Sequence, residues 1–368
     1  MANTPILLGN SIYERTGKGT RHPLAWPKTA PTLALIRRLP WYDPAQYVES
    51  PQTSSRRIKA FHDPNYVDAA FDAETQQMVP DAIRLKFGLG SSDNPIFPSV
   101  IHRASAACGA ALKAAALLRD GGVVHSPLGG AHHSQPARAS GFGYFNDLVL
   151  GIMALTETSS KRVAYIDLDA HHGNAVEDAF AFNPNVMTVS VHQQNCWPHS
   201  GIESDPKFNV YNLPVPAGFN DSEMAHVVQE GLLPLLDRFA PDAIVIQAGA
   251  DALEADTMMD LALSNLAYFD TIKQLRNRAP RIWVTGGGGY NPWAVVRCWT
   301  GIWCVLNDRD PDTSIPRDVE DDITAHIQAW PTVTAPQDNW LSTLQDAPRP
   351  GEVRQTVVDT VARCVATN

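Results

Sequence analysis

Residues 162–174 read RVAYIDLDAHHGN, an apolar run that leads directly into two carboxylates and two imidazoles. A short continuous apolar run of this kind is typical of a strand that is buried on both faces of a parallel sheet. Charged and titratable groups at the end of a buried strand are costly unless a partner compensates them. The stretch therefore predicts a parallel sheet with a functional site where this strand ends.

The same strand-then-helix alternation continues on both sides of this stretch. It predicts an α/β fold in one domain, residues 1–368, with a central, mostly parallel sheet flanked by helices on both faces. Residues 1–98 are rich in proline and predicted loops, and residues 313–368 are predicted to form a peripheral C-terminal tail. The predicted strands are 121–126, 162–168, 185–192, 242–249 and 281–287, and the predicted helices are 99–120, 144–158, 221–239 and 263–278.

Composition excludes several classes of protein. Hydrophobic residues make up 44% and charged residues 18% of the chain, as in globular proteins. A net charge of -10 argues against nucleic acid as a partner. No stretch approaches the roughly 20 apolar residues of a membrane span, and the start MANTPILLGN lacks the features of a signal peptide. The five cysteines form no CxxC pair. We expect a cytoplasmic protein without membrane contact.

Polar clusters stand at the carboxyl ends of all five predicted strands. They are GGAHHS, DLDAHHG, the single residue His192, GAD and GGGGYN. Ligands of open parallel sheets bind outside the carboxyl ends of the strands. We therefore expect these clusters to contribute to one shared site.

The residues at two of these strand ends match a catalytic metal site. Asp167, Asp169 and His171 share the period-two phase of an extended segment, and Asp251 adds a carboxylate from a neighbouring strand end. Asp169, His171 and Asp251 would leave one position open for water, as catalytic metal sites do. Taken singly, Asp251 is equally consistent with a helix cap and His192 with a structural role.

Two further clusters provide acid–base and oxyanion chemistry. His132 and His133 would face opposite ways in a strand, but a turn at Gly129 and Gly130 could direct both to the site. Histidine titrates in the range that a general base needs. Tyr290, which follows four glycines, could donate to a developing oxyanion. A nucleotide-binding role for these glycines lacks the GxGxxG spacing.

Five motifs follow one another along the chain: SGFGYFNDLVLGI, VAYIDLDAHHGNAVEDAF, VMTVSVH, QAGADAL and TGGGGYNPWAVVRCW. In this order they resemble the zinc-dependent histone deacetylase, acetoin-utilisation and acetylpolyamine amidohydrolase family, from about residue 13 to residue 307. This resemblance implies the arginase–deacetylase fold and hydrolysis of N-acyl amides on lysine side chains, polyamines or small amines. It implies Zn²⁺ as cofactor, with Fe²⁺ as a substitute, and structural K⁺.

The resemblance assigns roles to individual residues. His133 matches the general base and acid, His132 its electrostatic partner, and Asp167 the carboxylate that pairs with His132. Tyr290 matches the residue that binds the acetyl carbonyl oxygen. The metal ligands implied are Asp169, His171 and Asp251.

Further positions match the substrate tunnel and a potassium site. Gly141 and Phe142 match one tunnel wall, Trp197 the opposite aromatic wall, and Asp93 the rim aspartate that binds substrate backbone amides. The potassium site would comprise Asp167, Asp169, His171, Ser190 and Val191.

Three departures from the family pattern affect these expectations. Asn174 stands where many members have Asp behind the second histidine, which should leave His133 less basic. Thr29 replaces an Arg at the foot of the tunnel, which puts an Arg-assisted acetate exit in doubt. The loop around Trp197 is shorter, so the rim and the choice of substrate can differ.

Rival functions remain to be weighed. A two-metal ureohydrolase of the same fold would need additional aspartates near Asp251, yet GADALEAD offers none before Asp256. A catalytically silent acyl-lysine binder would normally lack Tyr290, one of the paired histidines or a metal ligand. The expected substrate is an acetylated lysine protein or peptide, or an acetylated small amine. The sequence leaves the oligomeric state open, a homo-oligomer included.

Overall fold

The protein forms one eight-stranded sheet in which every strand pair is parallel. The computed structural model describes residues 4–14, 22–25, 28–158, 161–311, 314–315, 321, 324, 336–337, 340 and 342–366. The strand order is β2-β1-β3-β8-β7-β4-β5-β6. The strands are β1 Ile6–Gly9, β2 Tyr47–Glu49, β3 Gly122–Ser126, β4 Val163–Asp167, β5 Val186–Gln193, β6 Val210–Val215, β7 Ala243–Gln247 and β8 Arg281–Thr285.

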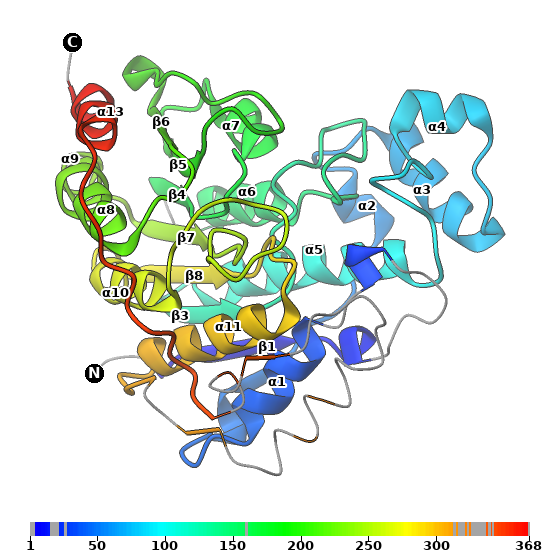
Figure 1. Ribbon diagram of the computed structural model, residues 1–368. Coiled ribbons are helices and arrows are strands. Elements are labelled where there is room, and N and C mark those ends of the chain that lie inside the picture. The colour runs from blue at the N-terminus through cyan, green and yellow to red at the C-terminus, as the bar shows by residue number, and fades with distance from the viewer. Residues whose placement is uncertain are drawn as a thin grey trace.

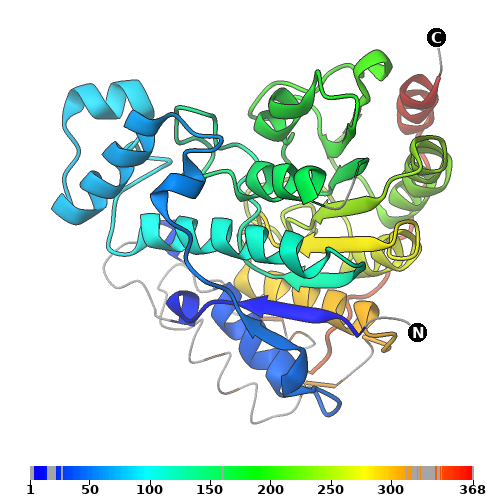
Figure 2. The ribbon, with the colours of Figure 1, turned by 180° about the vertical axis from the view of Figure 1, so that it is seen from behind.

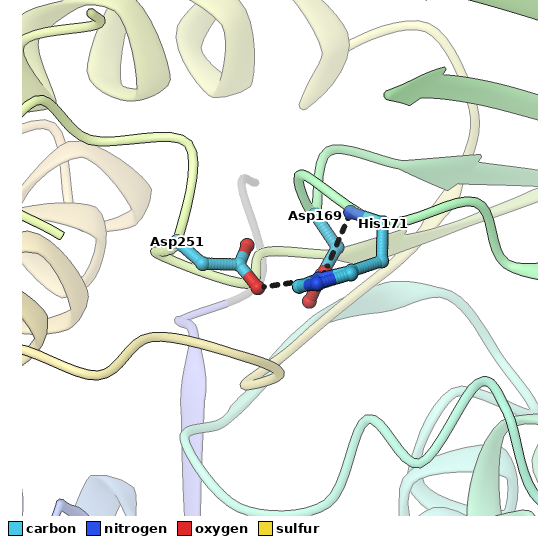
Figure 3. Close-up of side chains that lie close together, drawn as sticks. All are labelled: Asp169, His171 and Asp251. Atoms are coloured by element: carbon cyan, nitrogen blue, oxygen red, sulfur yellow. Dashed lines mark hydrogen bonds and ion pairs between the residues drawn. The ribbon is translucent and has the colours of Figure 1, made fainter. Parts of the chain in front are cut away.

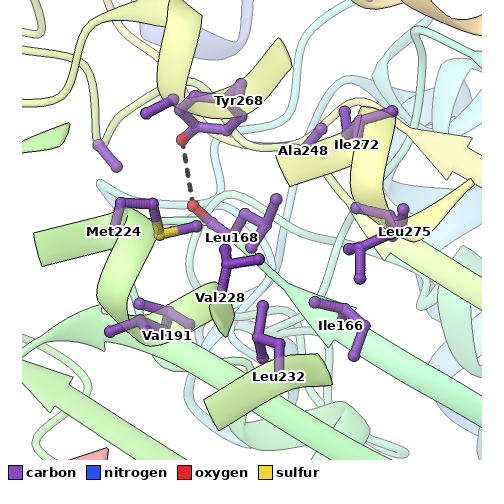
Figure 4. Close-up of a cluster of buried hydrophobic side chains, with 14 of the residues drawn as sticks. Ile166, Leu168, Val191, Met224, Val228, Leu232, Ala248, Tyr268, Ile272 and Leu275 are labelled. Carbon is purple, nitrogen blue, oxygen red and sulfur yellow. Dashed lines mark hydrogen bonds between the residues drawn. The ribbon is translucent and has the colours of Figure 1, made fainter. Parts of the chain in front are cut away.

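Both faces of the sheet are buried, because alternate residues of the central strands pack into two different cores. On β4, Ala164 and Ile166 belong to the core on one face, and Val163 and Tyr165 to the core on the other. Figure 4 shows Ile166 among side chains from the covering helices. This arrangement explains why the strands are almost continuously apolar, as the sequence predicts.

Helices cover the two faces in separate layers. α8 to α11 pack on one face, and α5 to α7 on the other, which Figure 2 shows from behind. The helices are α1 Thr29–Arg37, α2 Ser55–Ile58, α3 Pro64–Gln76, α4 Asp81–Phe87, α5 Val100–Leu117, α6 Asp147–Thr158, α7 Asn174–Phe180, α8 Asp221–His226, α9 Leu233–Phe239, α10 Asn265–Leu275, α11 Pro292–Leu306 and α13 Gln355–Val365.

The fold class is confirmed, and two local differences from the predicted elements have physical causes. The helix predicted over 221–239 is interrupted by a π-helical turn, Val227–Leu232, which ends two positions before Pro234. Proline has no N–H for the preceding turn, so regular hydrogen bonding cannot continue through it. Strand β6 was not predicted because it contains Pro214, which a strand tolerates at the sheet edge where β6 lies.

Residues 1–98 contain more regular structure than the predicted loops. Strands β1 and β2 form one edge of the sheet, and helices α1 to α4 lie in the same region. Asp63 accepts hydrogen bonds from the first turn of α3, and Pro64 occupies the first helical position. Prolines here start helices as well as loops.

The described part of the predicted tail packs against the body of the protein. Helix α13 lies against β6 and the π-helical turn. Arg354, just before α13, donates to both oxygens of Glu223 on α8 at 2.6 and 2.7 Å. The rest of the tail predicted over 313–368 lies outside the described residues. No helix among the described residues has the length and apolar character needed to span a membrane.

Candidate metal centre and active site

Asp169, His171 and Asp251 converge at the carboxyl ends of two neighbouring strands, β4 and β7. One ligand atom of each lies within 4.8 Å of the others. His171 Nδ1 lies 3.1 Å from Asp169 Oδ1 and 3.0 Å from Asp251 Oδ2 (Figure 3). Both carboxylates are almost fully buried. The expected convergence of these three side chains is therefore present.

The remaining carboxylate oxygens are held by neutral donors. Asp169 Oδ2 accepts from Gln247 Nε2 at 2.9 Å and from the Gly288 N–H at 2.8 Å. Asp251 Oδ1 accepts from the Ala170 N–H at 2.8 Å. A Cβ atom on Gly288 would collide with both carboxylates, which explains the glycine at this position. These contacts to Asp169 Oδ2 and Asp251 Oδ1 orient the two carboxylates toward a common centre.

The electrostatics of this group fit a divalent cation. Burial opposes charge on His171, but hydrogen bonds to Asp169 and Asp251 raise its pKa well above the usual value. Burial and then the Asp169 charge raise the pKa of Asp251 to about 6. Two buried carboxylates thus need positive charge between them, and oxygen and imidazole donors suit Zn²⁺ or Fe²⁺.

The two adjacent histidines lie side by side, with ring centroids 3.8 Å apart. His132 Nδ1 lies 2.7 Å from Asp167 Oδ2, which also accepts from the Tyr165 hydroxyl at 2.6 Å. His133 Nδ1 lies 2.9 Å from Asn174 Oδ1. With the Nδ1–H of His133 donating to Asn174, Nε2 of His133 is left as the basic atom of a neutral ring.

The Gly-rich turn directs both histidines to the cavity, as expected. Gly130 has φ +85°, and a Cβ there would collide with the chain after β8. Asp147 fixes the turn by accepting from the N–H groups of Gly130 and Ala131, both at 2.9 Å. His132 and His133 consequently line the same cavity although they are neighbours in the chain.

The environments of the two imidazoles push their pKa values apart. Burial disfavours the charged form of His132, but Asp167 and Asp169 raise its pKa to about 9. Burial lowers the pKa of His133 well below the usual value, and positive charge on His132 and His171 lowers it further. This difference suits one cationic and one neutral imidazole in a single site.

Tyr290 stands at the junction of the glycine run and α11. Its N–H donates to Asp256 Oδ2 at 2.6 Å, and Asn291 caps α11. Its ring makes an edge contact with Phe142, with centroids 5.8 Å apart. Burial, followed by the charges of nearby carboxylates, raises the pKa of Tyr290 well above 10. The phenol therefore keeps its proton, and no described residue accepts it.

A cavity of about 370 Å³ is lined by Asp169, His171, the two adjacent histidines and Tyr290, together with the expected substrate-binding residues. Gly141, Phe142, Trp197 and Asp93 all line it. Trp197 is 41% exposed and meets the His133 ring at 4.5 Å between centroids, so it lies at the mouth. Gly141 has a positive φ and packs so closely on these two rings that a Cβ would collide with both.

The other residues singled out in the sequence lie outside the metal group. Ser190 is opposite Asp167 in the sheet register, and Val191 follows it. His192 does not join the site, because it contacts Ser190 Oγ at 3.0 Å and the Gly201 carbonyl at 2.9 Å. Thr29 lines the cavity, and its hydroxyl donates to a backbone carbonyl at 3.0 Å.

Four residues of the site were missed by sequence reasoning: Lys28, Asp147, Gln247 and Asp256. Gln247 and Asp147 could have been found from the sequence, since each is a polar residue within one of the five family motifs. Asp256 belongs to the loop after β7, and burial together with Asp251 raises its pKa to about 7. Lys28 Nζ donates to two carbonyls of the glycine run at 3.2 and 3.1 Å. Only the folded loops bring these two residues to the site.

Known proteins resemble this chain over most of its length. The family model of the histone deacetylase domain matches residues 22–306. Histone deacetylase 8 of Xenopus laevis is 33% identical over 282 residues, or 74% of this chain and 86% of that protein. Histone deacetylase 6 of Arabidopsis thaliana is 33% identical over 318 residues, or 82% of this chain but 65% of that protein.

Solved structures agree with these sequence matches. The crystal structure of an HDAC homologue from Aquifex aeolicus has a TM-score of 0.91 and 30% identity, covering 99% of this chain and 100% of that one. An HDAC homologue complexed with SAHA has a TM-score of 0.89 and 29% identity, with the same coverage. The sequence match over residues 22–306 and the structural match over the whole sheet place this chain in the histone deacetylase family of hydrolases.

Proposed function

We propose that this protein is a zinc-dependent amidohydrolase that removes acetyl or other short acyl groups from the Nε atom of lysine or from a related amine. The observation that carries this proposal is the single cavity lined by His132, His133, Asp169, His171 and Tyr290, with Asp251 completing the metal group. An aromatic mouth and a buried polar end suit an extended, uncharged acyl-amine side chain.

Asp169, His171 and Asp251 would hold the metal. A zinc ion bound there supplies a Lewis acid that lowers the pKa of a water molecule to about 7 and polarises the amide carbonyl. Ferrous iron is the proposed substitute, since the same oxygen and imidazole donors bind it.

The protein's own groups would carry the proton transfers. His133 takes the proton of the attacking water at Nε2 and later gives it to the leaving amine. His132, kept cationic by Asp167, stabilises negative charge that develops beside it. Tyr290 donates a hydrogen bond from its phenol to the carbonyl oxygen as that oxygen gains charge. Phe142 and Trp197 hold the acyl-amine stem, and Asp93 at the rim accepts from substrate amides.

We also propose a structural potassium ion near Asp167, Asp169, His171, Ser190 and Val191. Two facts support it: Asp167 and Ser190 are neighbours in the sheet, and no described residue donates to the carbonyl oxygens of Asp169 or His171. Residues 1–368 are proposed to be one domain. The five cysteines are free, which supports the proposed cytoplasmic location.

Turnover of a panel of acyl amines tests the proposal. We expect the zinc-restored protein to hydrolyse an acetyl-lysine peptide, and metal-stripped protein to lose this activity. Equal rates for the two preparations would reject the metal role. Faster hydrolysis of acetylputrescine than of the peptide would instead identify a small-amine deacylase. Binding of acetyl-lysine peptide without any turnover would favour the silent binder.

A further inference from the structure

One arginine in the cavity wall, Arg103, has no hydrogen-bond acceptor for its guanidinium among the described residues. Arg103 on α5 is only 9% exposed and lines the same cavity as the histidine pair. Within the described ranges, no residue accepts a hydrogen bond from its guanidinium or forms an ion pair with it; its side-chain contact is the Tyr13 ring, 5.4 Å from the centroid. Burying such a charge without an acceptor is costly.

A second buried arginine, Arg297, shows how hydrogen-bond acceptors compensate the burial of a guanidinium elsewhere in this chain. Arg297 is 2% exposed and donates to Asp346 at 2.6 Å and to two backbone carbonyls at 2.8 and 2.7 Å. Every nitrogen of Arg297 thus has an acceptor, whereas Arg103 has none among the described residues. The contrast indicates that the acceptor for Arg103 comes from outside the chain.

The cavity provides room for such an acceptor. Val100, Arg103, Ala104 and Ala107 line it at positions i, i+3, i+4 and i+7, so one stripe of α5 forms part of its wall. Alanine leaves space on this stripe that the long Arg103 side chain can enter. The mouth carries exposed residues such as Trp197, whereas Val100, Arg103 and Ala107 on this stripe are buried. Arg103 therefore belongs to the deep part of the cavity.

The surroundings of Arg103 favour an anion with two acceptor oxygens in one plane, such as a carboxylate. Tyr13 covers the guanidinium with its ring, and its hydroxyl donates to the Arg103 carbonyl at 2.8 Å. Burial lowers the pKa of Arg103, but the ordinary guanidinium pKa is so high that the charge remains. Its fork of N–H donors matches the two oxygens of a carboxylate.

We propose that Arg103 forms a carboxylate-binding subsite at the deep end of the cavity. The identity of the ligand rests on the proposed function. Hydrolysis of an acyl amide adds water across the C–N bond, leaving a protonated amine and a carboxylate, so the released acid is one source. The terminal carboxylate of a longer acyl group, such as succinyl, is the other.

Binding of small carboxylates tests the subsite without any turnover, so its failure is distinct from failure of the proposed function. Calorimetric titration of the zinc-loaded protein with acetate and succinate should give dissociation constants at least about 10-fold weaker in Arg103→Met and intermediate in Arg103→Lys. The uncharged amides acetamide and succinamide should bind both proteins equally. Lys113→Met, which removes a cation from α5 outside the cavity lining, should match the wild type.

Equal carboxylate affinity in Arg103→Met and the wild type would overturn the proposal. Thermal unfolding excludes a merely structural role. Because the Arg103 guanidinium has no acceptor among the described residues and methionine can still pack on the Tyr13 ring, Arg103→Met should unfold at the same or a higher temperature than the wild type. A marked loss of stability with unchanged carboxylate affinity would assign Arg103 to packing instead.

Kinetics distinguish the two sources of the carboxylate. If the acyl terminus is bound, Arg103→Met should reduce the ratio of kcat/KM for succinyl-lysine over butyryl-lysine peptide by about 10-fold or more. If the released acid is bound, this ratio should not change, and inhibition by added acetate should weaken by a similar factor. No change in either quantity would overturn the proposal.

Discussion

Replacing Tyr290 with Phe removes one hydroxyl from the site and leaves the rest in place. The ring contact with Phe142 and the position of the ring below Lys28 Nζ, 5.6 Å away, do not need the hydroxyl. The backbone contact from the Tyr290 N–H to Asp256 also remains. Since no described residue accepts from the phenol, we expect the free energy of unfolding to change by at most about 0.5 kcal/mol.

The effect on catalysis should be much larger. Loss of one donor to a developing oxyanion lowers kcat by about 10²–10³-fold, or roughly 2.7–4 kcal/mol of transition-state stabilisation. The buried phenol keeps its proton because its pKa is raised well above 10, so it is a competent donor throughout the assay range. KM should change little, because the interaction strengthens mainly in the transition state.

The assay is steady-state hydrolysis of an acetyl-lysine peptide, with zinc content and thermal unfolding measured on the same preparations. Tyr211→Phe on β6 is the matched control, since it removes a hydroxyl from a residue that does not line the cavity. An unchanged kcat in Tyr290→Phe with full zinc content would refute the assigned role. A lost kcat accompanied by lost zinc would also refute it, because the effect would then be structural.

Three other predictions address the histidine pair and the C-terminal helix. Asn174→Asp places a carboxylate against His133 Nδ1, which now lies 2.9 Å from an amide oxygen. The added charge should raise the pKa of His133 and move the acidic limb of the pH profile of kcat/KM up by about 1 pH unit. An acidic limb that does not move would argue against His133 as the general base. His133→Ala should lower kcat by about 10²–10⁴-fold at unchanged zinc content, which metal analysis beside turnover checks; a near-normal rate would exclude it as proton carrier. Burial alone would raise the pKa of Glu223, but its hydrogen bonds to Arg354 lower this pKa below 4.5. The contact therefore stabilises the fold at pH values above 4.5. This stability is lost as the pH falls through the lowered pKa of Glu223. Glu223→Gln should cost about 1–3 kcal/mol at neutral pH in denaturant unfolding and flatten the acid dependence; equal stability would mean that α13 docks without this pair.

The central strands were predictable because burial on both faces leaves a clear sequence signal. In β4, alternate residues enter opposite cores, so the run is apolar throughout. In β6, Asn212 and Pro214 interrupt that signal. Only its place at the sheet edge allows the strand to form with a proline. Sheet position is a tertiary property that local sequence does not contain.

Some residues of the candidate site were likewise predictable from the local sequence, and others were not. Asp169 and His171 were predictable from strand phase, and Asp251 from the strand end that follows. Asp256 was not, because the loop after β7 folds back to reach the Tyr290 N–H. Arg103 stands in an alanine-rich helix, where a single arginine is typical of a solvent-facing position. Helix phase alone does not distinguish solvent from an internal cavity.

Zinc titration of metal-stripped protein tests the central claim most directly. We predict tight binding of one zinc ion per chain, with deacylase activity restored at the same equivalence point. Asp251→Asn should abolish tight binding, although its amide oxygen can still accept from the Ala170 N–H. Activity that returns without zinc, a stoichiometry of two, or equally tight binding in Asp251→Asn would contradict a single metal held by Asp169, His171 and Asp251.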